Sequence, residues 1–278
     1  MKDLSNENVV HIKNGECEYI QFRRLLEYED VVKHAYGLKP ANFMTRRNRV
    51  TEDVFKESVD NYKKLCNAIG VDYNRLIKPI QMHTNEVKVV EVLEDEMSFE
   101  NGKYANTDGL ITNKNGVVLA STNADCILLL FFDPVKKVIA NVHSGWKGTF
   151  QKIAVNAVKK MVDEFGSNPK DIICCICPSI RKCHFVVEKD VKDMCENIFS
   201  YTNQIDEIID YIGKISDVDK WVIDTVLINK IMLKDCGLLQ ENIIDSGICS
   251  VCNSDMVHSY RVEGKGYGLS SAIISEQL

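Results

Sequence analysis

The chain has 278 residues, a formal net charge of −6 and 45% hydrophobic residues. This ordinary apolar content excludes a disordered or fibrous chain, and the length permits a full hydrophobic core. The acidic balance argues against a nucleic-acid-binding protein, which would carry a basic stripe. The polar N-terminus lacks the apolar segment of a signal peptide, and the longest apolar run, CILLLFF, is too short to span a bilayer. We therefore expect a cytoplasmic protein with no membrane contact, forming a single domain over residues 1–278 as a monomer or weak homo-oligomer.

Three segments show the periodicity of amphipathic helices, with apolar residues recurring three and four positions apart. Each begins near a residue that can cap a helix and ends beside a glycine. The predicted limits are Thr51 to Gly70, Phe150 to Gly166, and Asp224 to Gly237. All three helices should pack one apolar face against the core.

Strand-like runs occupy the middle of the chain, at residues 87–93, 116–122, 126–132, 137–143 and 171–177. The central runs are apolar almost throughout, as expected for strands that are covered on both faces. Because strands cluster instead of alternating strictly with helices, the pattern favours an α+β domain of layered mixed sheets. No GxGxxG or GxxxxGK[ST] motif occurs, so neither common phosphate-binding glycine loop is present.

Two reactive side chains lie at the ends of neighbouring apolar runs. Cys126 opens CILLLFF and His143 closes KVIANVH, so a hairpin would bring them together. A thiolate and an imidazole in that arrangement can bind a soft metal or form a nucleophile–base pair. With His83 as a third ligand, the set suits Zn²⁺ with one open position. The alternative is a buried thiol with two unrelated histidines.

Eleven cysteines, an odd number, fit no disulfide framework, and we expect most to be free thiols in the core. Two C-x-x-C pairs, Cys174 with Cys177 and Cys249 with Cys252, raise the possibility of a closed zinc site. The first pair lies inside an apolar strand, where residues three apart point to opposite faces. This geometry favours core thiols over a second metal site.

The turn SGWKGT follows His143 directly. Thr149 is predicted to cap the helix that begins at Phe150, and Gly148 permits a tight turn. The N-terminus of a helix attracts anions, and Lys147 adds a positive charge. These features predict an anion site, although an ordinary strand–turn–helix connection would look the same.

For three further side chains, the sequence is compatible with more than one role. Asp125 is either a turn carboxylate or a group that transfers a proton or orients a metal-bound histidine. Asp108 is similarly ambiguous. Arg261 can reach an anionic ligand, but isolated arginines are more often on the surface.

Several motifs together resemble the YfiH-type family of laccase-domain proteins. These are QMHT, NADC, HSGWKG and the CxxC…HSYR segment, and the resemblance runs from about His34 to the C-terminus. It implies an α/β/β/α fold and a purine nucleoside phosphorylase that also deaminates adenosine and cleaves methylthioadenosine. The zinc ligands of the family would fall on His83, Cys126 and His143. The arginine of the family's turn is replaced by Lys147, which keeps the charge but loses the bidentate fork.

The six histidines include no H-x-H pair, whereas a multicopper oxidase needs many imidazoles. A single zinc site fits better, acting on purine nucleosides with phosphate as co-substrate. In that reading Lys147, Gly148, Thr149 and Arg261 bind phosphate or substrate, and Asp125 transfers a proton. The alternatives are a cysteine hydrolase or deamidase with a Cys126–His143 dyad, and a catalytically silent metal-binding domain.

Overall fold

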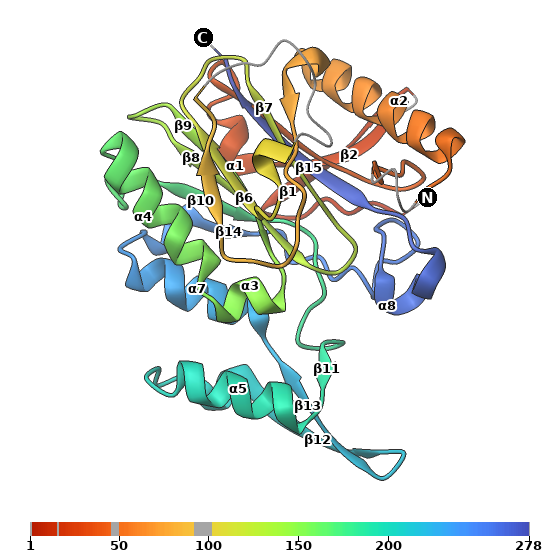
Figure 1. Ribbon diagram of the computed structural model, residues 1–278, viewed down its shortest axis with the longest axis vertical. Coiled ribbons are helices and arrows are strands. Elements are labelled where there is room, and N and C mark those ends of the chain that lie inside the picture. Colours follow the sequence, from red (N-terminus) through yellow and green to blue (C-terminus); the bar gives the residue numbers. More distant parts are fainter. Residues whose placement is uncertain (1, 16, 46–49, 92–101, 278) are drawn as a thin grey trace.

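Two sheets stacked face to face form the body of the protein, and helices cover both outer faces (Figure 1). The computed structural model describes residues 2–15, 17–45, 50–91 and 102–277. Within these residues the first sheet has the order β1 (Val9–Asn14), β2 (Cys17–Phe22), β3 (Val32–Gly37), β15 (Ser270–Glu276), β7 (Val118–Asn123) and β4 (Leu76–Ile77). The second has the order β14 (Ile243–Asp245), β10 (Ile173–Ile176), β8 (Ile127–Asp133), β9 (Val138–Ser144), β6 (Gly109–Thr112) and β5 (Val87–Val89).

Both sheets are mixed. The pairs β4–β7, β5–β6 and β10–β14 are parallel, and the other pairs in these two sheets are antiparallel. The helices of the body are α1 (Arg23–Leu26), α2 (Glu52–Ile69), α3 (Trp146–Phe150), α4 (Ile153–Phe165), α7 (Thr225–Asp235) and α8 (Tyr260–Glu263). Short 3₁₀ turns are η1 (Tyr73–Arg75), η2 (Gly102–Tyr104), η3 (Gln240–Asn242) and η4 (Gly264–Gly266). The prediction of an α+β fold with layers in the order α/β/β/α is therefore confirmed.

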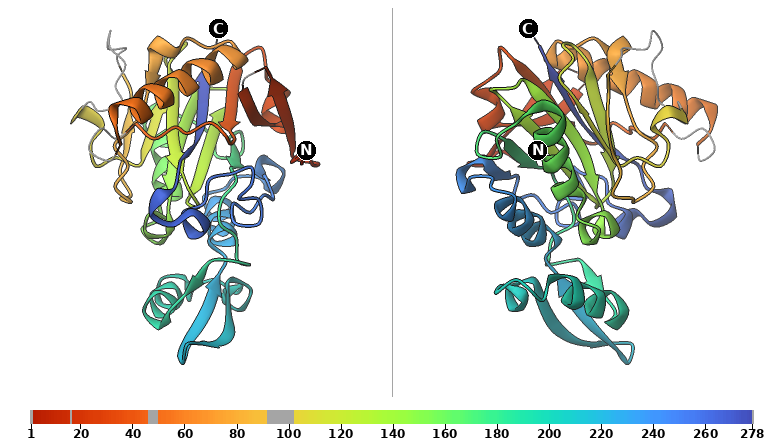
Figure 2. Two further views of the ribbon diagram at one scale, coloured as in Figure 1. Left: turned by 90° about the vertical axis from the view of Figure 1, so that its right-hand side faces the viewer. Right: turned by 60° about the vertical axis from the view of Figure 1, so that its left-hand side comes forward.

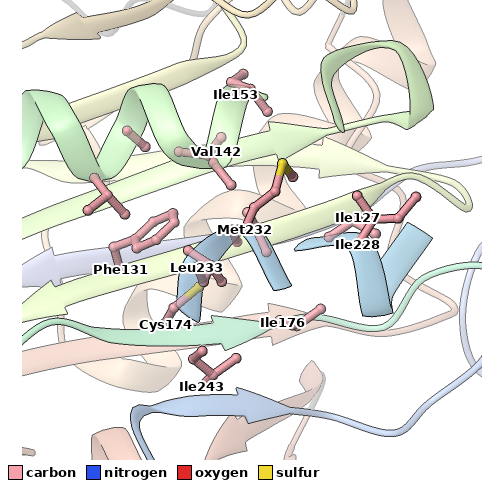
Figure 3. Close-up of a cluster of buried hydrophobic side chains, with 14 of the residues drawn as sticks. Ile127, Phe131, Val142, Ile153, Cys174, Ile176, Ile228, Met232, Leu233 and Ile243 are labelled. Atoms are coloured by element: carbon pink, nitrogen blue, oxygen red, sulfur yellow. The ribbon is translucent and has the colours of Figure 1, made fainter. Parts of the chain in front are cut away.

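The position of the central strand β8, between the first sheet and the helices, explains why its sequence is apolar throughout. Successive side chains of a strand point to opposite faces. Leu128 and Leu130 accordingly face the first sheet, whereas Leu129 and Phe131 face the helices α4 and α7. Figure 3 shows the helical side, where Phe131 packs among side chains that include Met232 of α7. The core therefore extends through both faces of this strand.

Helix α2 covers the outer face of the first sheet, where Tyr62 and Leu65 pack against Val118 and Ala120. Its limits were predicted correctly, and so was the start of α7. The side chains of Thr51 and Asp224 accept hydrogen bonds from first-turn N–H groups of α2 and α7, respectively. The predicted stop residues Gly70 and Gly237 have left-handed φ values of 74° and 95°. Only glycine adopts this conformation without strain.

The start of the second predicted helix was wrong. A short helix α3 begins at Trp146, Lys152 then takes a left-handed φ of 62°, and α4 begins only at Ile153. Thr149 lies inside α3 and does not cap a helix from Phe150. The predicted end at Gly166, whose φ is 66°, is confirmed.

A small lobe projects from the body and is built from residues 186–223 (Figure 2). It comprises β11 (Val186–Val187), α5 (Lys189–Phe199), α6 (Ile205–Ile208), β12 (Ile209–Ile215) and β13 (Val218–Ile223). Its three-stranded sheet was not anticipated from the sequence, and neither were β1–β4, β6, β14 and β15. Of the predicted run 87–93, residues 92 and 93 lie outside the described residues. No helix among the described residues has both the length and the apolar character needed to cross a membrane.

Asn141 links the two sheets through the middle of the core. It is buried on β9, and its side-chain amide donates to the carbonyl oxygens of Leu119 at 3.0 Å and Ala272 at 2.9 Å. Its amide oxygen accepts from the Ser121 hydroxyl. Leu119, Ser121 and Ala272 belong to the first sheet. A polar side chain is tolerated here because its hydrogen-bonding atoms have partners.

Replacing this bridge should weaken the fold. We expect Asn141→Ala to lower the free energy of unfolding by roughly 1–3 kcal/mol, because buried polar partners lose their hydrogen bonds. Urea denaturation measures the change, and Asn197→Ala, on the exposed side of α5, is the control. Equal stability of the two variants would contradict a bridging role.

Candidate metal centre

The hairpin β8–β9 brings Cys126 and His143 together. The strands pair antiparallel with Ile127 opposite Ser144 and Leu128 opposite His143. Cys126 directly precedes β8 and is half-buried, while His143 is buried near the end of β9. The sequence-based expectation that these strands form a hairpin is confirmed.

His83 reaches the same place from the segment between β4 and β5. Its Nε2 lies 3.8 Å from the Cys126 sulfur, and its ring centroid lies 4.9 Å from that of His143. The three candidate ligand atoms all lie within 4.8 Å of one another. Two ligands of a tetrahedral zinc ion with bonds of 2.0–2.3 Å are separated by roughly 3.5 Å. The spacing of the predicted trio is therefore close to that of a zinc centre.

The Asp108 carboxylate holds this arrangement. It is buried and accepts backbone N–H groups from Met82 at 3.1 Å, His83 at 3.0 Å and Thr84 at 2.8 Å. Its Oδ1 also lies 2.8 Å from Nδ1 of His143. With a proton on Nδ1, the opposite nitrogen of His143 is free to bind a metal. The same carboxylate fixes His83, whose backbone has a left-handed φ of 62°.

Gly145 leaves the space that these ligands need. A Cβ atom built on it would lie 2.9 Å from Cδ2 of His83, 3.2 Å from the Cys126 sulfur and 3.3 Å from Cε1 of His143. Its own φ is −60°, so space and not backbone conformation requires glycine here. One thiolate and two imidazoles around this space form a donor set that fits Zn²⁺ with an open fourth position.

The charges of the trio are strongly coupled. Burial alone would raise the pKa of Cys126, but the His143 charge and hydrogen bonds from His143 and His83 outweigh it and lower the pKa to about 6. Burial would lower the pKa of His143, but Cys126 and Asp108 raise it to about 9. At neutral pH the cysteine is therefore a thiolate, the form that binds metals and also the form that acts as a nucleophile.

Asp125 points away from the trio. Its backbone has a positive φ of 88°, and its buried carboxylate accepts from the hydroxyls of Ser250 at 2.6 Å and Ser259 at 2.7 Å. The same carboxylate accepts the backbone N–H of Arg261 at 2.7 Å. The exposed guanidinium of Arg261 donates to the carbonyl oxygen of His184 at 3.0 Å. Orientation of a candidate ligand, one of the roles considered for Asp125, thus belongs to Asp108.

The turn after His143 places its side chains in different directions. Lys147 is exposed, with its ammonium 5.5 Å from the centroid of the Trp146 ring. Gly148 packs closely, since a Cβ would lie 3.0 Å from the carbonyl oxygen of Thr84. The Thr149 hydroxyl is buried and donates to the carbonyl oxygen of Ser144 at 3.2 Å. Of the predicted phosphate ligands in this turn, only Lys147 is exposed.

The comparison with protein families decides the classification. The model of the family described as multi-copper polyphenol oxidoreductase laccase matches residues 41–276. The chain belongs to this family. The match covers His83, Cys126 and His143 as well as the turn that follows.

Three curated relatives of this laccase-family chain carry names from purine metabolism. "Purine nucleoside phosphorylase LACC1" from Homo sapiens is 28% identical over 78% of this chain and 47% of its own length. "Purine nucleoside phosphorylase YlmD" from Bacillus subtilis is 28% identical over 80% of this chain and 82% of its own. "Adenosine deaminase RL5" from an unknown prokaryotic organism is 27% identical over 73% and 76%. The chain spans about half the length of the human relative.

A solved structure shows the same fold. The crystal structure of YfiH from Bacillus licheniformis has a TM-score of 0.80 and 24% sequence identity, covering 92% of this chain and 96% of that one. The resemblance to YfiH-type proteins noted from the motifs is thereby confirmed.

Removing the charge of Asp108 should loosen the trio. We expect Asp108→Asn to lower the affinity for zinc about 10–100-fold, because partners that orient metal-bound histidines typically contribute this much. Competition with a chromogenic chelator measures the affinity. Asp133→Asn, another buried aspartate of the core sheet, controls for general destabilisation. Equal affinities in the two variants would refute the orienting role.

The lowered pKa of Cys126 predicts its reactivity in metal-free protein. Alkylation by iodoacetamide requires the thiolate, so labelling of Cys126 should be half-maximal near pH 6 and level above pH 7. Cys236, whose thiol pKa is raised mainly by burial, should react only in alkaline solution. Peptide mass spectrometry over a pH series resolves the two sites. A profile for Cys126 that follows Cys236 would contradict the coupling with His143.

Proposed function

We propose that the chain is a zinc-dependent purine nucleoside phosphorylase that also deaminates adenosine and accepts methylthioadenosine. The observation that carries this proposal is the trio His83, Cys126 and His143 around the space beside Gly145. Because His83 is exposed and Cys126 is half-buried, a zinc ion held by the trio would have its fourth position accessible to solvent. An open position is the mark of a catalytic zinc site.

The names of the relatives supply the class of substrate. Two kinds of activity, phosphorolysis of purine nucleosides and deamination of adenosine, occur among those names. Both reactions act on the same class of nucleoside. The match to YlmD covers most of each chain, which favours a shared activity over a shared fragment.

When bound, zinc would act as a Lewis acid that lowers the pKa of water or polarises the substrate. The residues of the chain have complementary tasks. Asp108 keeps the proton on Nδ1 of His143 and holds the backbone of His83. The exposed ammonium group of Lys147, four residues after His143, would attract phosphate beside the trio. The Asp125 carboxylate accepts three hydrogen bonds and holds the backbone of Arg261 next to its own neighbour Cys126, so its role is to position these residues and not to transfer a proton.

A cysteine hydrolase is the second candidate, because one specific observation favours it. Cys126, His143 and Asp108 have the order of contacts found in a nucleophile, base and orienting carboxylate. This dyad needs no second imidazole. His83 nevertheless lies against Cys126 in a left-handed backbone conformation that costs free energy. A strained histidine beside the thiolate fits a metal ligand better than a bystander.

The copper chemistry in the family description fits the side chains less well. A multicopper site needs many imidazoles, and the chain has six histidines in all. His34 is buried in the first sheet, where its Nε2 accepts the backbone N–H of Phe22 at 2.7 Å. The trio offers only two imidazoles and one thiolate. This set suits one zinc ion.

The test is a metal analysis combined with a nucleoside panel. Purified protein should contain zinc and convert adenosine, inosine, guanosine and methylthioadenosine to free base and sugar phosphate in phosphate buffer. Without phosphate, adenosine should yield inosine. Cys126→Ala and His83→Ala should lose zinc from this centre and lose both reactions. Activity of zinc-free protein, or wild-type rates in Cys126→Ala, would overturn the proposal, and stoichiometric inactivation of metal-free active enzyme by iodoacetamide would favour the cysteine hydrolase.

Lys147 separates the two reactions. Lys147→Ala should raise the KM for phosphate about tenfold, the effect of losing one charge-assisted hydrogen bond of roughly 1.5 kcal/mol, and leave deamination unchanged. Lys147→Arg should lower that KM because arginine binds phosphate with two parallel N–H groups. Lys159→Ala, an exposed lysine of α4, is the matched control. Equal loss of phosphorolysis and deamination in Lys147→Ala would contradict a phosphate-specific role.

A further inference from the structure

Four side chains outside the trio converge from two loops. Cys183 and His184 lie between β10 and β11, and Cys249 and Cys252 lie between β14 and α8. Nδ1 of His184 is 3.1 Å from the Cys183 sulfur, 3.7 Å from the Cys249 sulfur and 3.6 Å from the Cys252 sulfur. The sulfurs of Cys183 and Cys249 are 3.7 Å apart. All four candidate ligand atoms lie within 4.8 Å of one another.

These separations match the edges of a tetrahedron around one metal ion. Zinc bonds of about 2.3 Å to sulfur and 2.0–2.1 Å to nitrogen give edges of roughly 3.5–3.8 Å. The separations of 3.6, 3.7 and 3.7 Å lie in this range, whereas the 3.1 Å between His184 and Cys183 is shorter. Three thiolates and one imidazole form a closed set that leaves no position for substrate.

Neither of the ordinary explanations for clustered cysteines fits. A disulfide requires sulfurs about 2.05 Å apart, and the 3.7 Å between Cys183 and Cys249 is far longer. Core packing accounts for Cys174 and Cys177, which are buried in or beside β10 as predicted. Cys183 and Cys252 are exposed, so core packing does not account for them. Of the second C-x-x-C pair, Cys249 is buried as predicted, whereas the prediction of a core thiol was wrong for Cys252.

The surrounding backbone holds the two loops in this arrangement. The N–H of Ser179 donates to the carbonyl oxygen of Ile248 at 3.2 Å, and the N–H of Ser250 donates to the carbonyl oxygen of Ser179 at 3.0 Å. Arg181 forms an ion pair with Asp245 at 2.7 Å across the same junction. The ligands therefore come from segments that are fixed relative to each other, as a preorganised site requires.

We propose that Cys183, His184, Cys249 and Cys252 bind a second, structural zinc ion. The ion joins the segment that leads into the small lobe to the loop that precedes α8. This inference does not rest on the proposed function, because it uses none of the residues of the first centre.

The second site is connected to the first through Asp125. Ser250, next to Cys249, donates to the Asp125 carboxylate, and so does the backbone of Arg261. Arg261 also donates to the carbonyl oxygen of His184. Since Asp125 directly precedes Cys126, a metal that fixes both loops also fixes the backbone beside one ligand of the first centre.

Zinc stoichiometry tests the proposal. Elemental mass spectrometry of the gel-filtered full chain should give two zinc ions per chain for wild type, and one each for Cys252→Ser and for His83→Ala. Cys236→Ser, which removes a half-buried cysteine that belongs to neither set of ligands, should keep two. Circular dichroism checks that the variants are folded, and Cys183→Ser replaces Cys252→Ser if the latter is not.

Cobalt substitution identifies the ligands. In His83→Ala, the remaining Co²⁺ should show the intense visible bands of tetrahedral coordination and the near-ultraviolet charge-transfer band of several thiolates, and Cys183→Ser should weaken the latter. One zinc ion in wild type that survives in Cys252→Ser, or a Cys249–Cys252 disulfide in the freshly isolated protein, would overturn the proposal. One zinc ion that is lost in Cys252→Ser but kept in His83→Ala would support the second site and count against the zinc centre of the proposed function.

Discussion

A single buried carboxylate, that of Asp108, determines the geometry of the first centre. It receives three consecutive backbone N–H groups from residues 82–84 and the Nδ1 proton of His143. Burial would raise the pKa of Asp108, but its hydrogen bond and charge interaction with His143, together with Thr84, lower it to about 2. A carboxylate with a depressed pKa contributes stability above its usual pKa of 3.8, and this contribution is lost as the pH falls toward 2. Over the neutral range, the interaction that orders the site also stabilises the fold.

Whether a feature of the fold or of the site could be predicted depended on how far apart in the sequence its interacting residues lie. Cys126 and His143 are separated by one tight hairpin, so the ends of two apolar runs sufficed to bring them together. The role of Asp108 required the pairing of β6 with β9, which no local pattern encodes. The small lobe was missed because the exposed strand β12 has little apolar alternation. Lys152 interrupts a helix whose periodicity continues across it, so the sequence predicted one helix where there are two.

The second set of ligands shows a related limit. The alternation of side chains along β10 correctly predicted that Cys174 and Cys177 point to opposite faces of the sheet. The same reasoning, however, also led to the prediction that Cys249 and Cys252 are core thiols. Their partners, Cys183 and His184, are adjacent in sequence and form no spaced motif. The two loops are brought together by the pairing of β10 with β14, the parallel contact of residues 179 and 249, and the Arg181–Asp245 ion pair. A metal-binding motif can be recognised in a sequence when both of its halves have a characteristic spacing between ligands. Here the adjacent residues Cys183 and His184 have no such spacing.

The two sets of ligands differ in number and exposure, and this difference assigns their roles. The first offers one cysteine and two histidines around a glycine, and it would leave one position of a bound zinc ion free. The second offers three cysteines and one histidine, which in our proposal would surround one zinc ion completely. A metal with a free position can act on a substrate, whereas a saturated metal can only hold its ligands together. Since Asp125 is hydrogen-bonded to the loops of the second set and directly precedes Cys126, we expect a metal in the second set to make the backbone beside the first set more rigid. The hydrogen bond from Ser250 to Asp125 thus links the residue next to Cys126 to a loop more than a hundred residues further along the chain.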